Sequence, residues 1–244
     1  MKNIIVVGLG ETGAPIKKIE EEAGNTVWVR EIKGEHKLPT AKEKIDVMHV
    51  CTPHLYDFCD RVVEWTNYHN PKLVIIHSTV PVGTTRNIAI RVKAAIVHSP
   101  IRGVHPNLYQ GILIFKKLIG GDDMSAKEAI KHLKSINLEP VHIGCSENTE
   151  LAKLLSTTYY GWNILFAKLV KKICVESGLD YDMVYKIPNE TYNEGYTKLG
   201  MGHVTRPVLI PPKGRIGGHC VAQNFDLLPS SKIKALVKEL NEQM

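Results

Sequence analysis

The sequence predicts an α/β protein with a parallel sheet in its N-terminal part, followed by a long helix and a small helical C-terminal region. Three observations predict it. Short apolar runs alternate with helical patterns over residues 3–144. A glycine-rich turn follows the first apolar run, at residues 8–13. A long helical pattern without proline then covers residues 148–178. Continuous apolar strands that alternate with helices are typical of a parallel sheet covered by helices on both faces.

The first part contains seven expected strands and four expected helices. The strands are expected at residues 3–8, 26–31, 45–52, 72–79, 94–99, 117–121 and 139–144. The helices are expected at residues 13–23, 56–69, 83–92 and 125–136, where apolar residues recur at helical spacing.

The character of the sequence changes after Ser146. The helical pattern at 148–178 is followed by a polar stretch at 187–220, which we expect to be rich in loops, and by an amphipathic helix within 230–244. We therefore predict two domains: residues 1–146, which bind a cofactor, and residues 147–244, which dimerise and carry the substrate and catalytic region.

Composition excludes several classes of protein. The chain has 244 residues, of which 43% are hydrophobic and 23% charged, as in soluble globular proteins. We expect no membrane span, no signal peptide and a cytoplasmic location. The net charge of +6 is scattered, which suits ligands that carry phosphates better than it suits nucleic acid. The five cysteines include no C-x-x-C pair, so we expect no disulfide framework and no metal site.

The glycine-rich turn predicts a dinucleotide site. Gly8, Gly10 and Gly13 form G-x-G-x-x-G between a strand and a helix, which is the pattern of a Rossmann domain. The first glycine would allow the tight turn, the second would let the backbone approach a pyrophosphate, and the third would let helix and strand pack closely. We expect the turn residues Glu11 and Thr12 to line the same site.

Glu31 predicts which dinucleotide binds. It ends the second expected strand, 23 residues after Gly8, where an acid hydrogen-bonds the adenosine ribose. A carboxylate repels a 2′-phosphate, so NAD is favoured over NADP, although the neighbouring Arg30 works against this preference.

Polar residues end the third and fourth expected strands. Thr52 and Pro53 follow one strand, and Ser78 and Thr79 follow the next. Ligands of open α/β sheets bind beyond the carboxyl ends of the strands, so we expect these four residues to line the site. A turn or capping role is the alternative for Thr79.

Lys153 is a candidate catalytic residue. It shares one face of the long helix with Glu150 and Thr157, and the surrounding sequence is rather apolar. A lysine in such surroundings is either paired or functional, and the pattern alone leaves both open.

The motifs "GLGETG", "STVPVGTT", "IGG" at 119–121, "ELAKLL" and "GRIGGHC" at 214–220 occur here in one order. Together they resemble the nucleotide-sugar 6-dehydrogenases, the UDP-glucose/GDP-mannose dehydrogenase family, over roughly residues 1–228. The resemblance implies a Rossmann domain followed by a long helix that forms the core of a homodimer.

The resemblance also implies roles for individual residues. Cys220 matches the family's catalytic thiol, which attacks an aldehyde made by a first hydride transfer. Lys153 matches the lysine that stabilises developing oxyanion charge, and Thr79 matches a threonine near the reacting centre. Glycines before the cysteine, Gly217 and Gly218, would let the backbone approach the sugar.

The sequence departs from the family at several positions. Asn224 and Thr157 stand where the family has an aspartate and an asparagine, and Ile101 stands where it has a water-activating glutamate. We expect no counterpart of the family's C-terminal nucleotide-binding domain. Asn193 and Arg206 belong to a polar stretch and a basic loop that could form a replacement anion site, and a solvated basic loop is the alternative.

Three functions follow as hypotheses. The first is an NAD-dependent oxidoreductase acting on a CH–OH group of a sugar nucleotide or a related phosphorylated or carboxylated sugar. The second is a two-electron dehydrogenase of the β-hydroxyacid or 6-phosphogluconate type that uses Lys153 as its acid/base group. The third is a non-catalytic NAD-binding homologue.

Overall fold

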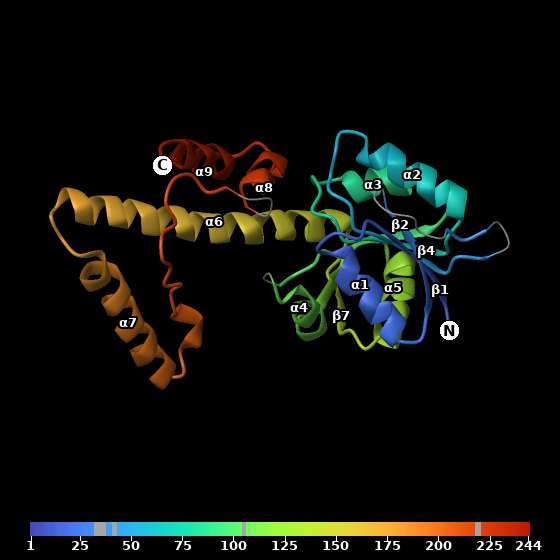
Figure 1. Ribbon diagram of the computed structural model, residues 1–244, viewed down its shortest axis with the longest axis horizontal. Helices are drawn as coiled ribbons and strands as arrows, with labels where there is room; N and C mark the ends of the chain where they lie inside the picture. Colours follow the sequence, from blue (N-terminus) through green and yellow to red (C-terminus); the bar gives the residue numbers. More distant parts are fainter. Residues whose placement is uncertain (32–37, 41–42, 104–105, 218–220) are drawn as a thin grey trace. The chain divides into compact units, whose positions relative to one another are not determined.

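The computed structural model describes residues 1–31, 38–40, 43–103, 106–217 and 221–244 (Figure 1). The chain forms two compact units, Met1–Lys153 and Leu154–Met244. The division lies within one long helix, so the first turns of that helix belong to the first unit.

A five-stranded sheet forms the centre of the first unit. Its strands are β1 (Asn3–Val7), β2 (Thr26–Arg30), β3 (Val47–Val50), β4 (Leu73–Ile76) and β5 (Ala95–His98). Every neighbouring pair is parallel, in the order β2-β1-β3-β4-β5. The predicted parallel α/β sheet is confirmed.

Helices cover both faces of this sheet, as Figure 1 shows. Alternate residues of a strand point to opposite faces. Ile4 and Val6 of β1 pack with α1 (Gly13–Glu22) and α5 (Asp123–Ser135), whereas Ile5 and Val7 pack with α2 (Phe58–His69) and α3 (Thr84–Ala89). The two apolar faces bury both sides of the sheet and fix the register of its strands.

A second, two-stranded parallel sheet follows the edge strand β5. It consists of β6 (Lys117–Ile119) and β7 (Pro140–His142). The backbones of His98 and Gly120 exchange two hydrogen bonds of 2.9 Å, which hold β6 against the end of β5. The short helix α4 (Leu108–Ile114) precedes β6 and was not expected from the sequence.

The second unit is helical. The helix α6 (Ser146–Glu176) confirms the long helical pattern, and α9 (Lys232–Glu242) confirms the C-terminal one. Between them lie a π-helical turn (Asp182–Lys186), α7 (Ile187–Lys198), a 3₁₀ turn (Gly202–Val204) and α8 (Ala222–Leu227). A small core of Leu165, Ile216, Phe225 and Val237 holds α6, α8 and α9 together.

The expectation of a loop-rich stretch from residue 187 is wrong for its first part, which forms α7. No residue of α7 is buried, so its sequence carries no apolar stripe that could have indicated a helix. Pro188 stands in the first turn, where proline is compatible with a helix. Among the described residues, no helix is long and apolar enough to cross a membrane.

Candidate functional site

The strand order reverses at the centre of the first unit's sheet. The chain leaves β1 to form β2 on one side and later returns to form β3 on the other. Ligands of doubly wound sheets bind where the strand order reverses in this way. Gly8 follows β1 at this point and Thr52 lies beyond β3, so both lie at the carboxyl edge of the sheet.

Two of the three motif glycines are required by close packing. Gly8 has a φ of +89°, and a Cβ atom there would lie 3.0 Å from Thr52 Cγ2. A Cβ atom at Gly13 would lie only 1.7 Å from the carbonyl oxygen of Gly8. By contrast, a Cβ atom at Gly10 would meet nothing within 4 Å. The turn is therefore tight against β3 and open at Gly10, as a backbone that approaches a pyrophosphate requires.

The remaining predicted cofactor residues lie around the same turn. Glu31 Oε2 accepts a hydrogen bond of 2.6 Å from the Leu9 amide, so this carboxylate lies beside the glycine turn. Thr12 immediately precedes α1 without capping it, and Glu11 is exposed beside it. Ser78 Oγ donates to the Thr52 carbonyl at 2.6 Å, which joins the segments beyond β3 and β4. Pro53 is exposed next to Thr52.

The start of α6 holds the segment that carries Thr79. Glu150, which is fully buried, accepts hydrogen bonds from the amides of Gly83 (2.6 Å) and Thr85 (2.8 Å). Burial raises the pKa of Glu150, whereas the hydrogen bonds from residues 83 and 85 favour the carboxylate. Thr79 itself is half-buried on the segment that Glu150 anchors.

The buried imidazole of His98 makes a second connection to α6. Its Nε2 lies 3.0 Å from the Ser78 carbonyl, and its Nδ1 lies 2.8 Å from Thr149 Oγ1. The carbonyl can only accept, so Nε2 carries the proton and Nδ1 accepts from the threonine. Burial lowers the pKa of His98 to about 3, so the ring is neutral near pH 7.

Lys153 lies one turn further along α6, at the same edge of the sheet. Its Nζ donates a hydrogen bond of 2.8 Å to the carbonyl of Ile101, and the side chain is half-buried. The first unit thus places the glycine turn, Thr79 and an ammonium group beyond the carboxyl ends of neighbouring strands. This arrangement can bind a dinucleotide and stabilise negative charge on a reacting oxygen.

A chain of buried polar groups runs through the same unit. Glu20 Oε1 lies 2.9 Å from His49 Nε2 and 2.8 Å from His132 Nε2, and His49 Nδ1 lies 2.9 Å from His77 Nε2. Burial alone would raise the pKa of Glu20, but the hydrogen bonds from His132 and His49 hold it below its ordinary value.

Glu20, His49 and His132 place three possible metal-ligand atoms within 4.8 Å of one another. Lys2 Nζ lies 3.1 Å from His132 Nδ1, and an ammonium can only donate. The proton of His132 therefore resides on Nε2, the atom that faces Glu20, and the cluster is a hydrogen-bonded network. The expectation of a protein without a metal site stays a prediction.

The substrate-binding residues predicted for the second half lie in the second unit. Asn224 Nδ2 donates to Thr157 Oγ1 at 3.2 Å, so two of the three residues that differ from the family pattern are paired. Gly217 is exposed, with open space around it. Gly218 and Cys220 lie outside the described residues.

Residues on both sides of that segment are anchored in the second unit. Ile216 is buried, and its amide donates to Asn241 Oδ1 at 2.7 Å. Val221 and Phe225 pack so closely on α6 that a Cβ atom at Gly161 would lie 2.8 Å and 2.7 Å from their side chains. The sequence around "GGHC" is therefore tied to α6 and α9 on either side.

Asn193 and Arg206 connect α7 to the loop that follows it. The Asn193 amide exchanges two hydrogen bonds of 2.8 Å with the backbone of Arg206. The guanidinium of Arg206 lies 3.6 Å from the centroid of the Tyr192 ring. These contacts give both residues a structural role, and their predicted role in binding substrate stays a prediction.

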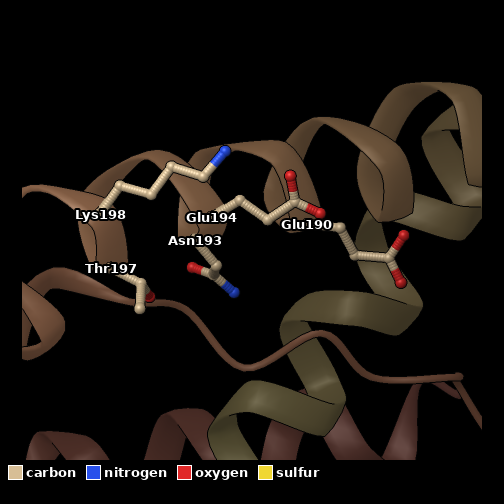
Figure 2. Close-up of a pocket in the computed structure, with 5 residues that line it drawn as sticks. All are labelled: Glu190, Asn193, Glu194, Thr197 and Lys198. Atoms are coloured by element: carbon tan, nitrogen blue, oxygen red, sulfur yellow. The ribbon is translucent and has the colours of Figure 1, made fainter.

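Figure 2 shows a surface pocket beside these residues, on α7. It is lined by Glu190, Asn193, Glu194, Thr197 and Lys198. The lining carries two carboxylates and one ammonium, so the pocket does not favour an anionic sugar.

Sequence reasoning missed His98, Thr149 and Lys117 as parts of this region. Thr149 adjoins Glu150 in "TELAK", but a hydroxyl in the first turn of a helix is an ordinary feature. His98 and Lys117 lie in short apolar strands, where a polar residue gives no hint of its partners in the folded chain.

Comparisons with known proteins show similarity in sequence and in fold, although no protein-family model matches the chain. The UDP-N-acetyl-D-mannosamine dehydrogenase of Methanocaldococcus jannaschii is 26% identical over 294 aligned positions, which cover 100% of this chain and 66% of that protein. The solved UDP-D-ManNAc dehydrogenase of Pyrococcus horikoshii has a TM-score of 0.78 at 18% identity, covering 99% of this chain and 68% of the other.

A third similar protein is covered over most of its own length. The 3-hydroxyisobutyrate dehydrogenase of Mycobacterium tuberculosis has a TM-score of 0.68 at 16% identity, covering 100% of this chain and 93% of the other. The resemblance seen in the motifs is confirmed: the chain is a relative of the UDP-glucose/GDP-mannose (nucleotide-sugar) dehydrogenases and spans 66% of the length of the curated relative described above.

Proposed function

We propose that the protein is an NAD-dependent oxidoreductase that acts on a CH–OH group of a sugar nucleotide or a related anionic sugar. One observation carries the proposal: a single unit places the glycine turn, Thr79 and Lys153 at the same edge of a parallel sheet. The activity in the names of the relatives supports the choice of a sugar nucleotide as substrate.

The residues at the glycine turn fit a dinucleotide. The tight packing of Gly8 and Gly13 leaves the turn open at Gly10, and the helix α1 that follows favours a pyrophosphate at its N-terminus. Glu31 would hold the adenosine ribose and favour NAD over NADP. When bound, NAD supplies the hydride acceptor. The chain's own residues orient the substrate and handle protons and negative charge.

The proposed chemistry divides between two residues. Lys153 stabilises the negative charge on the substrate oxygen as hydride leaves carbon, and the hydroxyl proton is released. The Cys220 thiolate then adds to the aldehyde carbon. The resulting thiohemiacetal loses its hydroxyl proton and a second hydride, for which a second NAD would be the acceptor, and becomes a thioester. Water cleaves the thioester, which releases a carboxylate and regenerates the thiol. Thr79 assists near the reacting centre.

Replacing Lys153 by methionine should lower kcat by about 100-fold, because one charged donor to an oxyanion is removed. The KM for NAD should change little, since the glycine turn is intact. Steady-state NADH absorbance measures both constants. Lys172→Met is the matched control, because Lys172 lies on the same helix, is exposed and forms an ion pair with Glu176 one turn away. Equal effects of the two substitutions would remove Lys153 from the mechanism.

A panel assay tests the function. The purified chain is incubated with NAD or NADP and with UDP-N-acetyl-D-mannosamine, UDP-glucose, GDP-mannose, sugar phosphates or short hydroxyacids. We expect NADH formation with a sugar nucleotide, and a lower rate with NADP. Tight NAD binding without reduction by any substrate would favour a non-catalytic NAD-binding homologue.

A second candidate is a two-electron dehydrogenase of the β-hydroxyacid type. It is supported by the similarity in fold to the 3-hydroxyisobutyrate dehydrogenase, at a TM-score of 0.68, and by the half-buried ammonium of Lys153. In this mechanism Lys153 takes the hydroxyl proton and Cys220 has no covalent role. One NADH per substrate, with a ketone or aldehyde as product, would identify it.

We further propose that the chain forms a homodimer through α6. Large apolar side chains of this helix are exposed, including Tyr159 (63%), Phe166 (49%), Ile173 (59%) and Val175 (72%). Exposed apolar patches of this kind mark association surfaces. Sedimentation velocity should therefore give twice the chain mass, and Ile173→Glu together with Val175→Glu should shift the protein to monomer. A wild-type monomer at micromolar concentration would contradict this assembly.

A further inference from the structure

The ammonium group of Lys117 is buried beside backbone carbonyls. Lys117 is 3% exposed at the start of β6, and its Nζ donates to the carbonyls of Ser99 (2.6 Å) and Pro100 (3.0 Å). It also lies 3.3 Å from His77 Nδ1. None of these contacts within the described part of the chain is a carboxylate. Burying an ammonium group in this way costs free energy, so we expect Lys117 to have a role that depends on its position.

The two carbonyls that Lys117 binds directly precede the carbonyl that Lys153 binds. Ser99 and Pro100 follow β5, and the next residue, Ile101, accepts the hydrogen bond from Lys153 Nζ at 2.8 Å. Arg102 then donates to the carbonyl of Lys116 at 2.7 Å. The 99–101 segment is thus fixed to the start of β6, and it presents its last carbonyl to the ammonium at the candidate site.

Several titratable and charged groups surround Lys117. They are Cys51 beyond β3, His49 on β3, His77 beyond β4, His98 on β5, Arg102 beyond β5 and Lys153 on α6. Burial lowers the pKa of Lys117 to about 7, and the positive charges of Lys153 and Arg102 act in the same direction. Lys117 therefore titrates near neutrality, whereas an exposed lysine would stay charged.

We propose that Lys117 is a positioning residue for Lys153: it orients the 99–101 segment so that the Ile101 carbonyl places the Lys153 ammonium at the reacting oxygen. This inference rests on the proposed function, because the role of Lys153 does. Lys117 does not touch the substrate in this account. It acts through two backbone carbonyls, and its protonated form holds them more strongly than its neutral form.

Lys117→Met tests the inference, with Lys116→Met as the matched control. Lys116 is the preceding residue, and its side chain is 61% exposed. We expect Lys117→Met to lower kcat about tenfold with the Kd for NAD unchanged within about twofold, and to remove the limb of the kcat–pH profile near pH 7. Lys116→Met should behave as wild type. An unchanged kcat in Lys117→Met would overturn the inference, and Lys117→Gln serves if the methionine variant does not fold.

A second readout needs no turnover. The rate at which a soluble activated ester acylates Lys153, followed by peptide mass spectrometry, should rise several-fold in Lys117→Met because the Ile101 carbonyl no longer restrains the amine. If the wild-type chain reduces no NAD, the proposed function fails, and this rate still decides whether Lys117 positions Lys153. An unchanged acylation rate would overturn the inference on its own.

The pH dependence of the unfolding equilibrium tests whether Lys117 is the group that titrates near neutrality. Its folded pKa of about 7 lies below the ordinary value of 10.5, so between these values the unfolded chain binds a proton that the folded chain lacks. The unfolding equilibrium constant of wild type, relative to Lys117→Met, should therefore fall up to about tenfold per pH unit across this window and stay level below it. A constant ratio from pH 6 to about 10 would show that Lys117 keeps an ordinary pKa and would contradict the neutral-pH part of the inference.

Discussion

Replacing Gly13 by alanine is expected to abolish detectable NAD binding and to destabilise the first unit. The new Cβ atom would lie 1.7 Å from the carbonyl oxygen of Gly8 and 2.8 Å from its carbonyl carbon. Both atoms belong to the backbone, so no rotation of a side chain can relieve the clash. Gly8 is held in turn by Thr52, only 3.0 Å from its own Cβ position.

The clash must move either α1 or the glycine turn, and each movement spoils the dinucleotide site. We expect a loss of about 3 kcal/mol in the free energy of unfolding, as for severe overpacking. We also expect NAD affinity to fall by at least about 100-fold, the equivalent of roughly 3 kcal/mol of binding free energy. Denaturant unfolding and calorimetric titration with NAD measure the two effects.

Gly195→Ala is the matched control for this substitution. Gly195 lies within α7 of the second unit, and a Cβ atom there meets nothing within 4 Å. Alanine should be neutral or slightly stabilising there, because it raises helix propensity. If Gly13→Ala bound NAD as tightly as Gly195→Ala does, the glycine turn would not be the dinucleotide site.

Replacing Cys220 by alanine is expected to eliminate steady-state oxidation to the carboxylate, with a fall in kcat of about 10⁴-fold. Removal of a nucleophile leaves only the catalysis provided by binding and charge stabilisation. NAD affinity should stay within about twofold of wild type, because the glycine turn lies elsewhere in the sequence. NADH absorbance and intact-protein mass measure turnover and any covalent adduct.

Cys145→Ala is the control, since Cys145 is an exposed free thiol in the first unit. It should retain wild-type turnover. If Cys220→Ala instead kept full turnover with one NADH per substrate, the thiol would have no covalent role, and the β-hydroxyacid type of reaction would account for the activity.

The sheet could be predicted because its signals are local. β3 and β4 are buried along their whole length, and "VMHV" and "LVII" appear in the sequence as short apolar runs. The turn at Gly8–Gly13 could also be predicted, because the close packing of the backbone requires glycine at this spacing. In the structure, Gly13 lies so close to Gly8 that a Cβ atom does not fit.

The connections made by α6 could not be predicted from local patterns. Glu150 appeared as one member of an ion pair on a helix face, whereas it binds two backbone amides more than 60 positions earlier in the chain. Lys117 and His98 stand in apolar strands, and their partners come from the segments that follow β4 and β5 and from α6. Such buried polar contacts depend on the tertiary fold, which periodicity does not encode.

The helix α7 could not be predicted, because its sequence carries no local hydrophobic signal. It has no buried face, so the hydrophobic period that reveals α1 or α5 is absent from its sequence. Contacts that hold it, such as that between Asn193 and the Arg206 backbone, join side chains to a loop that has no pattern of its own.

Isotope transfer from substrate to cofactor tests the central claim most directly. UDP-N-acetyl-D-mannosamine with deuterium at both C6 positions is incubated with the chain and NAD, and the reduced cofactor is analysed by mass spectrometry. We expect each reduced nicotinamide to carry one deuterium, with two equivalents formed per sugar, and Lys153→Met to slow the transfer. Tight binding of NAD with no deuterium transferred from this or any other labelled sugar nucleotide would contradict the central claim.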